Sequence, residues 1–178
     1  TGFASNTTLS GYGRGKCGGG DYSDWEGPIT FTTLCDPGSV PFFEGFESGY
    51  TEEDAIAGCW TQENILTAAE SWEGNDTYTS YNRAPRTGSW NAMLRYYASD
   101  WLFYPLTLAG GTEYTFEVYA RQDATSGLSM TLAYGGADNA ADMANTVVGP
   151  TAITNGGYQL IAGTFTPATS GVYYIGIL

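Results

Sequence analysis

The residues of this sequence whose types could support catalysis are carboxylates. Glu52, Glu53 and Asp54 form an acidic run, and two carboxylates can hydrolyse a glycosidic bond when one acts as the acid and the other as the nucleophile or base. The acid of such a pair needs an apolar pocket that raises its pKa, and the sequence around the run supplies none. We therefore interpret the run as a solvated loop. Glycoside hydrolysis remains the less favoured alternative.

Histidine is absent from the chain. Its absence removes every imidazole base, every Ser-His-Asp or Cys-His pair, and the commonest zinc ligand. We expect a protein that is not an enzyme.

The three cysteines are Cys17, Cys35 and Cys59, so at least one thiol has no partner within the chain. If residues 7–17 and 28–35 form a hairpin, Cys17 lies opposite the start of the second strand, and Cys35 lies roughly 24 Å farther along it at about 3.4 Å per residue. Because the Cα atoms of a disulfide lie within about 7 Å of each other, we predict the pair Cys35–Cys59. Three reduced thiols are the alternative. A disulfide would indicate an oxidising, extracellular compartment.

The charge balance excludes two classes of partner. Acidic residues number 19 and basic residues 6, which gives a formal net charge of -13. Such a chain is repelled by nucleic acid and by anionic lipid surfaces. No stretch reaches the roughly 18 apolar residues of a membrane span, so we expect no membrane insertion.

The pattern of alternating residues predicts an all-β protein. Residues 114–120 and 128–134 each place apolar side chains on one face, and their short polar connection predicts an antiparallel hairpin. Frequent turn signals favour an antiparallel two-sheet β-sandwich, a jelly roll. The other predicted strands are 41–48, 59–64, 90–97, 101–108, 158–166 and 172–178, and the one predicted helix is 139–145.

The first 36 residues differ from the rest. Residues 7–17 and 28–34 predict an N-terminal β-hairpin, which cannot bury a core of its own. The sequence from residue 37 to residue 178 predicts the sandwich. The apolar run 170–178 stops at the last residue, so both ends look like parts of a longer pattern, and the final strand needs a neighbour.

Two stretches resemble known families. Residues 6–12, 17–21 and 27–33 resemble the last two strands of the fibronectin type III modules of secreted bacterial surface proteins. Residues 37–178 resemble a MAM-like jelly-roll domain of the cleaved-adhesin or choice-of-anchor J type without its last strand. The motifs that carry this second resemblance are residues 43–49, 59–63 with Trp72, 87–93, 100–102 and 114–121.

The resemblance implies a non-catalytic extracellular adhesion or binding module, whose partner is a carbohydrate or a surface protein. It also implies a structural calcium ion near the opening strand, for which Glu47 and, less strongly, Glu44 are the candidate ligands, because hard cations take carboxylate oxygens. A solvated acidic surface is the alternative at these positions. As an alternative function, the incomplete ends indicate a structural repeat of a filament, in which neighbouring copies complete one another by strand addition.

Surface features complete the set of candidate sites. Asn6 and Asn75 satisfy the N-glycosylation pattern, with ordinary surface turns as the alternative. Exposed aromatic rings stack on sugars and anchor protein interfaces. The aromatic residues that we predict for a ligand or interface are Tyr96, Tyr97, Trp101 and Tyr173.

Overall fold

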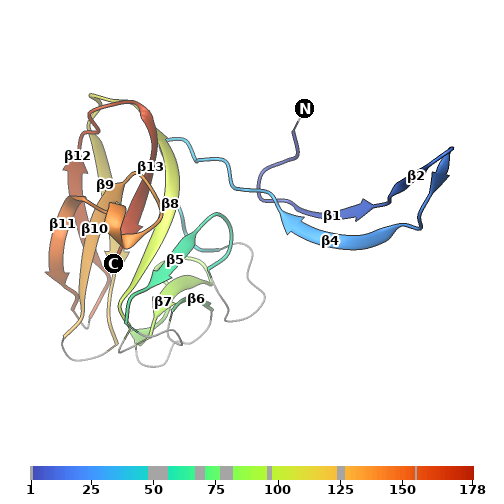
Figure 1. Ribbon diagram of the computed structural model, residues 1–178. Helices are drawn as coiled ribbons and strands as arrows, with labels where there is room; N and C mark the ends of the chain where they lie inside the picture. The colour runs from blue at the N-terminus through green and yellow to red at the C-terminus, as the bar shows by residue number, and fades with distance from the viewer. Residues whose placement is uncertain are drawn as a thin grey trace. The chain divides into compact units, whose positions relative to one another are not determined.

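The computed structural model is all-β and divides into two compact units, Thr1–Asp36 and Pro37–Leu178 (Figure 1). The division falls at the residue where the sequence changes character. The structure describes residues 2–47, 56–66, 71–76, 82–95, 98–123, 127–154 and 156–178.

The first unit is a hairpin. Strand β1 (Thr8–Gly13) pairs antiparallel with β4 (Glu26–Thr32), and the short strands β2 (Lys16–Gly18) and β3 (Asp21–Tyr22) form its tip. Near the tip, the Arg14 guanidinium lies 4.0 Å from the ring centroid of Tyr22 and 4.7 Å from that of Trp25.

The two faces of this hairpin differ in polarity. Leu9 is paired with Phe31, and Gly11 with Ile29, so these side chains share one face, whereas Thr8 and Thr32 lie on the other. Ile29 and Phe31 remain exposed. The apolar face of the hairpin is therefore not covered within its own unit.

The second unit has two layers, as predicted for a sandwich. The first layer is a five-stranded sheet in the order β11-β10-β13-β8-β5, and all its strand pairs are antiparallel. The strands are β5 (Thr61–Asn64), β8 (Asp100–Leu108), β10 (Ser129–Gly135), β11 (Asn145–Ala152) and β13 (Gly171–Ile177).

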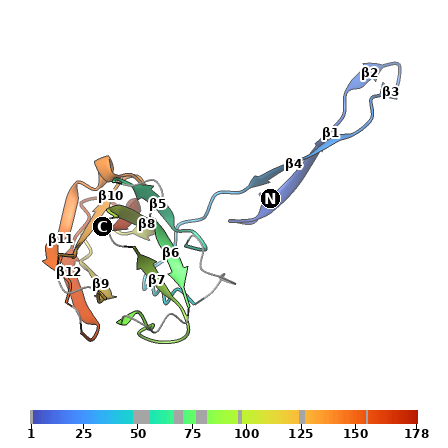
Figure 2. The ribbon, with the colours of Figure 1, turned by 90° about the horizontal axis from the view of Figure 1, so that it is seen from below.

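The second layer consists of two separate ribbons. Strand β9 (Tyr114–Ala120) pairs with β12 (Gln159–Phe165), and β6 (Trp72–Asn75) pairs with β7 (Asn91–Leu94). The predicted hairpin between residues 114–120 and 128–134 is wrong, because β9 and β10 belong to different layers. Alternation identifies the buried face of a strand but not its partner, and both strands direct their apolar faces to the same core from opposite sides. Figure 2 shows the layers end-on.

The predicted helix 139–145 is a single 3-10 turn, Ala140–Asp142, capped by Asn139. This turn lies over the outer face of the five-stranded sheet, where Met143 packs with Trp101 and Phe103 in a second small core. Gly135 and Gly176 allow this close approach, since a Cβ on Gly135 would lie 1.9 Å from the Asp142 carbonyl oxygen. Strand β8 is consequently buried on both faces at its centre.

One other expectation needs correction, and two strands of the structure were not expected. Residues 41–47, predicted as part of a strand, are irregular, and Phe46 has a φ of 58° that interrupts extended backbone. Strands β6 and β11 were not predicted, because each is interrupted by glycine and β11 also contains Pro150.

Candidate functional site: a groove between two open strand edges

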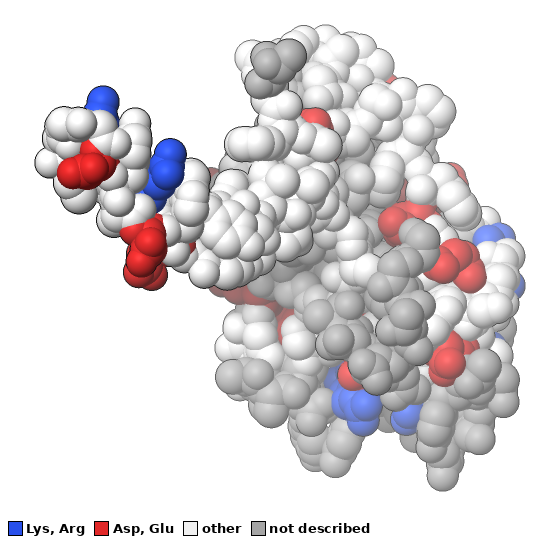
Figure 3. Space-filling model, turned by 90° about the vertical axis from the view of Figure 1, so that its right-hand side faces the viewer, with Lys and Arg blue, Asp and Glu red and all other residues white. Residues whose placement is uncertain are grey.

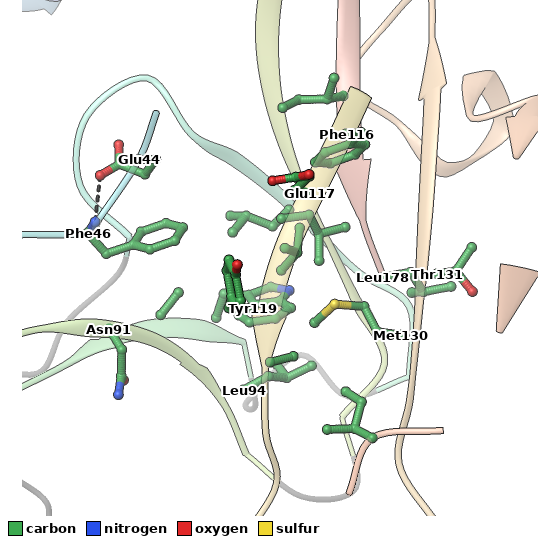
Figure 4. Close-up of a pocket in the computed structure, with 18 of the residues that line it drawn as sticks. Glu44, Phe46, Asn91, Leu94, Phe116, Glu117, Tyr119, Met130, Thr131 and Leu178 are labelled. Atoms are coloured by element: carbon green, nitrogen blue, oxygen red, sulfur yellow. Dashed lines mark hydrogen bonds between the residues drawn. The ribbon is translucent and has the colours of Figure 1, made fainter. Parts of the chain in front are cut away.

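A groove of about 1510 Å³ opens between β9 and β7. Figure 4 shows Phe116 and Tyr119 along β9 among the lining residues, which also include Leu94 of β7 and Met130 of the five-stranded sheet. Exposed residues such as Glu117, Tyr119 and Arg86 line it, so it is open to solvent. A sealed apolar void of even one fifth of this volume, about 300 Å³, would cost about 7 kcal/mol, comparable with the whole stability of a domain.

The floor of the groove is apolar because of strand alternation. Strands β8 and β13 form the centre of the five-stranded sheet, and every second residue of each points toward the second layer. The floor residues, defined here by their position on these two strands, are Leu102, Leu106, Leu108, Ile175 and Ile177.

The walls of the groove end in unpaired strand edges. Within the described part of the chain, β9 pairs only with β12, and β7 pairs only with β6. A strand paired on one side leaves about half of its backbone N–H and C=O groups on the other side without a partner. Two such edges border one apolar groove.

An aromatic cluster closes one side of the groove. Phe42 stacks on Tyr104 with ring centroids 4.3 Å apart, and Trp60 lies 5.0 Å from Tyr104 and 5.4 Å from Phe46. Burial, followed by the neighbouring Glu44 carboxylate, raises the pKa of Tyr104. The irregular segment 41–47 therefore supplies aromatic packing to the groove.

A cationic cluster lies at the end of the groove where β9 finishes. The Arg86 guanidinium stacks 3.6 Å from the ring centroid of Tyr119. Arg121 donates hydrogen bonds to Asn82 Oδ1 at 2.9 Å and to the Ala84 carbonyl oxygen, and it lies 4.5 Å from the Tyr158 ring centroid. These contacts fix the 82–86 loop against β9.

Basic residues are concentrated at the groove, although the chain as a whole is acidic. All four basic residues of 37–178 line the groove, namely Arg83, Arg86, Arg95 and Arg121. Arg83 is paired with Asp123 at 2.6 Å and Arg95 with Glu73 at 2.9 Å. Figure 3 shows acidic side chains scattered over one face of the molecule.

The two predicted calcium ligands act as hydrogen-bond acceptors. Glu44 accepts the backbone N–H of Phe46 at 2.6 Å and the indole N–H of Trp60 at 3.3 Å. Glu47 accepts the N–H of Ser89 at 2.9 Å and that of Trp90 at 3.4 Å. Among the described residues, His, Cys, Asp and Glu form no group of three or more that could hold a metal ion. The calcium ion stays a prediction.

Replacing Glu47 tests its role as an anchor of the 88–90 turn. We expect Glu47→Ala to lower the free energy of unfolding by about 1 kcal/mol, because it removes acceptors for two backbone N–H groups. Glu113→Ala, at another exposed glutamate, should leave it unchanged. Thermal unfolding with and without excess calcium measures both roles. Equal effects of the two substitutions would contradict the role of Glu47 as an anchor of the turn. A rise in Tm with calcium that Glu47→Ala abolishes would support a calcium ion bound at Glu47.

Asp100 is a fully buried carboxyl group beside the groove. Burial raises its pKa above the ordinary 3.8, and nearby Ser71 opposes this rise. The Ser71 hydroxyl donates to Gln62 Oε1 at 2.6 Å. Neither Asp100 oxygen has a hydrogen-bond partner of good geometry within the part of the chain that the structure describes.

A raised pKa makes the stability depend on pH in a defined direction. The folded state binds the Asp100 proton more tightly than the unfolded state, so stability falls as the pH rises from 3.8 through the folded-state pKa. We expect Asp100→Asn to raise the free energy of unfolding by about 1 kcal/mol at pH 7, with a gain that shrinks toward pH 3. Exposed Asp138→Asn is the control. Urea unfolding over this pH range would contradict the account if the gain grew at low pH.

The structure corrects two predicted surface sites. Trp101 is buried and stacks on Phe103 with ring centroids 5.8 Å apart, so it is not a surface aromatic. Asn75 is fully buried and donates to Asn91 Oδ1 at 3.1 Å, so its amide is not at the surface, where a glycan would have to be attached. Both residues lie on strands whose inward faces the local sequence did not identify.

Of the remaining predicted site residues, two lie in the described part of the chain and five lie outside it. Asn6 is exposed in a turn, and its glycosylation stays a prediction. Tyr173 is half-buried, with its hydroxyl donating to the Thr169 carbonyl oxygen at 2.9 Å. Predicted positions outside the described residues are Tyr96, Tyr97, Glu52, Glu53 and Asp54.

The cysteine prediction is confirmed. Cys35 and Cys59 form a disulfide, and Cys17 is an exposed free thiol.

Sequence reasoning missed the groove and its arginines. The arginines come from 83–86, 95 and 121, and no local spacing relates them. The one available signal was compositional, because four of the six basic residues fall within residues 83–121.

A scan against protein-family models and a search of the curated proteins found no match. The resemblances to fibronectin type III and MAM-like domains therefore stay predictions. Across the described ranges, no helix is long and apolar enough to cross a membrane.

Proposed function

We propose that this chain is a non-catalytic binding module of an extracellular protein, and that the groove between β9 and β7 holds its partner, a protein or a carbohydrate. The observation that carries the proposal is an open apolar groove bordered by aromatic rings and a few polar groups, which is the usual composition of a binding site. The Cys35–Cys59 disulfide supports an extracellular location, since disulfides persist in oxidising compartments.

The non-catalytic part of the proposal rests on chemistry. The chain has no histidine. Five carboxylates line the groove. Glu44 accepts two N–H groups and Asp123 is paired with Arg83, so both are engaged in holding the structure. Asp100 is fully buried, and Glu113 and Glu117 are exposed to solvent. Turnover of a polysaccharide by the chain would contradict this part.

An apolar fluorescent anion, anilinonaphthalene sulfonate, tests whether the groove binds ligands. We expect it to bind the folded chain with a rise in fluorescence, and Ala92→Trp to abolish binding by filling the groove beside β7. Val172→Trp, at an exposed position of β13, is the matched control and should bind as the unmodified chain does. Binding that is absent, or unaffected by Ala92→Trp in a variant with an unchanged near-UV spectrum, would contradict the proposal.

The class of partner is tested separately. A glycan array hit that Ala92→Trp removes and Val172→Trp keeps would identify a carbohydrate. An array without hits, together with dye binding, would favour a protein partner.

A second candidate function is a structural repeat of an extracellular filament assembled by strand addition between copies. Two observations favour it. The edges of β9 and β7 have no second partner strand among the described residues, and the hairpin unit does not cover its own apolar face. Light scattering and electron microscopy test it. Regular fibres or concentration-dependent oligomers would support a filament, and a monomer at all concentrations would contradict it.

A further inference from the structure

We propose that the groove between β9 and β7 binds an extended peptide strand of another chain, with apolar side chains pointing to the floor and a carboxylate beside Arg86. This inference rests on the proposed function, and it specifies the ligand class of the same site.

The backbone argument comes from the two strand edges. Residues 114–120 pair with β12 on one side, and residues 91–94 pair with β6 on one side. Every residue of β9 and of β7 lines the groove, whereas β12 contributes only Phe165 and β6 only Trp72, so the opposite side of each strand faces the groove. A peptide between them would hydrogen-bond with both edges and join the two ribbons into one sheet. A sugar could not satisfy two rows of alternating N–H and C=O groups in this way.

The side-chain argument comes from the two faces of such a strand. Its inward residues would meet Leu106 and Ile175 on the floor, which are buried aliphatic residues. Its outward residues would lie beside Thr115, Glu117 and Tyr119, the exposed positions of β9. A strand with apolar and polar residues in alternation fits both surroundings.

The charge argument specifies one more group of the ligand. Arg86 is exposed and stacks on Tyr119, and the acceptors of Arg121 among the described residues are the neutral oxygens of Asn82 and Ala84. The Arg121 Nε atom is buried and has no acceptor within the described residues. Two guanidinium groups at one end of the groove, in a chain of net charge -13, favour a carboxylate from the ligand.

Synthetic peptides of alternating Val and Thr test this inference. The first peptide carries a glutamate at each end. The second carries a lysine at each end, and the third is the glutamate peptide with a central proline. Affinity is measured by calorimetry, and amide hydrogen exchange locates the bound peptide.

We expect the glutamate peptide to bind and to slow exchange in β9 and β7. The proline peptide should bind at least about tenfold more weakly, because proline lacks the N–H needed for pairing. Arg86→Glu should weaken the glutamate peptide about tenfold and strengthen the lysine peptide. Arg14→Glu, a charge reversal in the hairpin unit, should change neither.

Any of three results would overturn the inference. The first is no binding of the glutamate peptide at about 1 mM, and the second is equal binding of the proline peptide. The third result is a bound peptide that does not slow exchange in β9 and β7. If these occur while the dye still binds and Ala92→Trp still blocks it, the groove-binding function stands and only the strand ligand is wrong. If the dye also fails to bind, the proposed groove-binding function is contradicted as well. Slower exchange in both strands at high protein concentration, with dimers in light scattering, would identify a second copy as the source of the strand.

Discussion

Gly135→Ala is expected to lower the free energy of unfolding of the second unit by about 3 kcal/mol. A Cβ at this position would lie 1.9 Å from the Asp142 carbonyl oxygen and 2.6 Å from its carbonyl carbon. Because these are backbone atoms of the turn that covers the sheet, no side-chain rotation relieves the overlap. The turn would have to move away, which would also disturb the packing of Met143 on Trp101 and Phe103.

Gly136→Ala is the matched control for this prediction. It makes the same chemical change one residue later, where a Cβ would have nothing within 4 Å, and it should leave stability nearly unchanged. Urea unfolding of both variants gives the comparison. Similar losses in the two variants would contradict the role of the turn.

Removing the disulfide is expected to have an effect of similar size. Cys35→Ser should lower the free energy of unfolding by about 3.5 kcal/mol, the chain-entropy value for a closed loop of about 25 residues. The start of the folded loop is already held in place, because Gly38 exchanges two backbone hydrogen bonds of 2.9 Å with Pro105 and Thr107 of β8. The cross-link therefore acts mainly by restricting the unfolded chain.

Cys17→Ser is the control, since Cys17 is exposed and free. Thermal or urea unfolding should not distinguish it from the unmodified chain. Reduction of the unmodified chain should reproduce the loss seen in Cys35→Ser. An equally large loss in Cys17→Ser would contradict the disulfide assignment.

Much of the strand pattern follows from the sequence because alternation is a local property. The runs that became β9 and β13 show it clearly, and the structure places strands at both. Strand β11 was missed because Gly149 and Pro150 interrupt it, which an edge strand tolerates. Strand β6 was missed because it has four residues and includes a glycine, so its pairing with β7 defines it more than its composition does.

The candidate site could not be predicted in the same way. Packing between distant segments decides which strands pair. No local signal therefore indicated that β9 pairs with β12 and not with β10. The groove depends on this pairing, because it leaves one edge of β9 without a described partner. Trp101 was misjudged for a related reason: β8 is buried on both faces, and alternation does not show which aromatic residues of such a strand are exposed.

Amide hydrogen exchange of the free chain tests the open groove most directly. We expect alternate amides of β9 and β7, those that point into the groove, to exchange on the order of 100-fold faster than amides of β8, which has neighbours on both sides. Uniform protection along β9 and β7, equal to that of β8, would mean that both edges are already paired and would contradict the binding site.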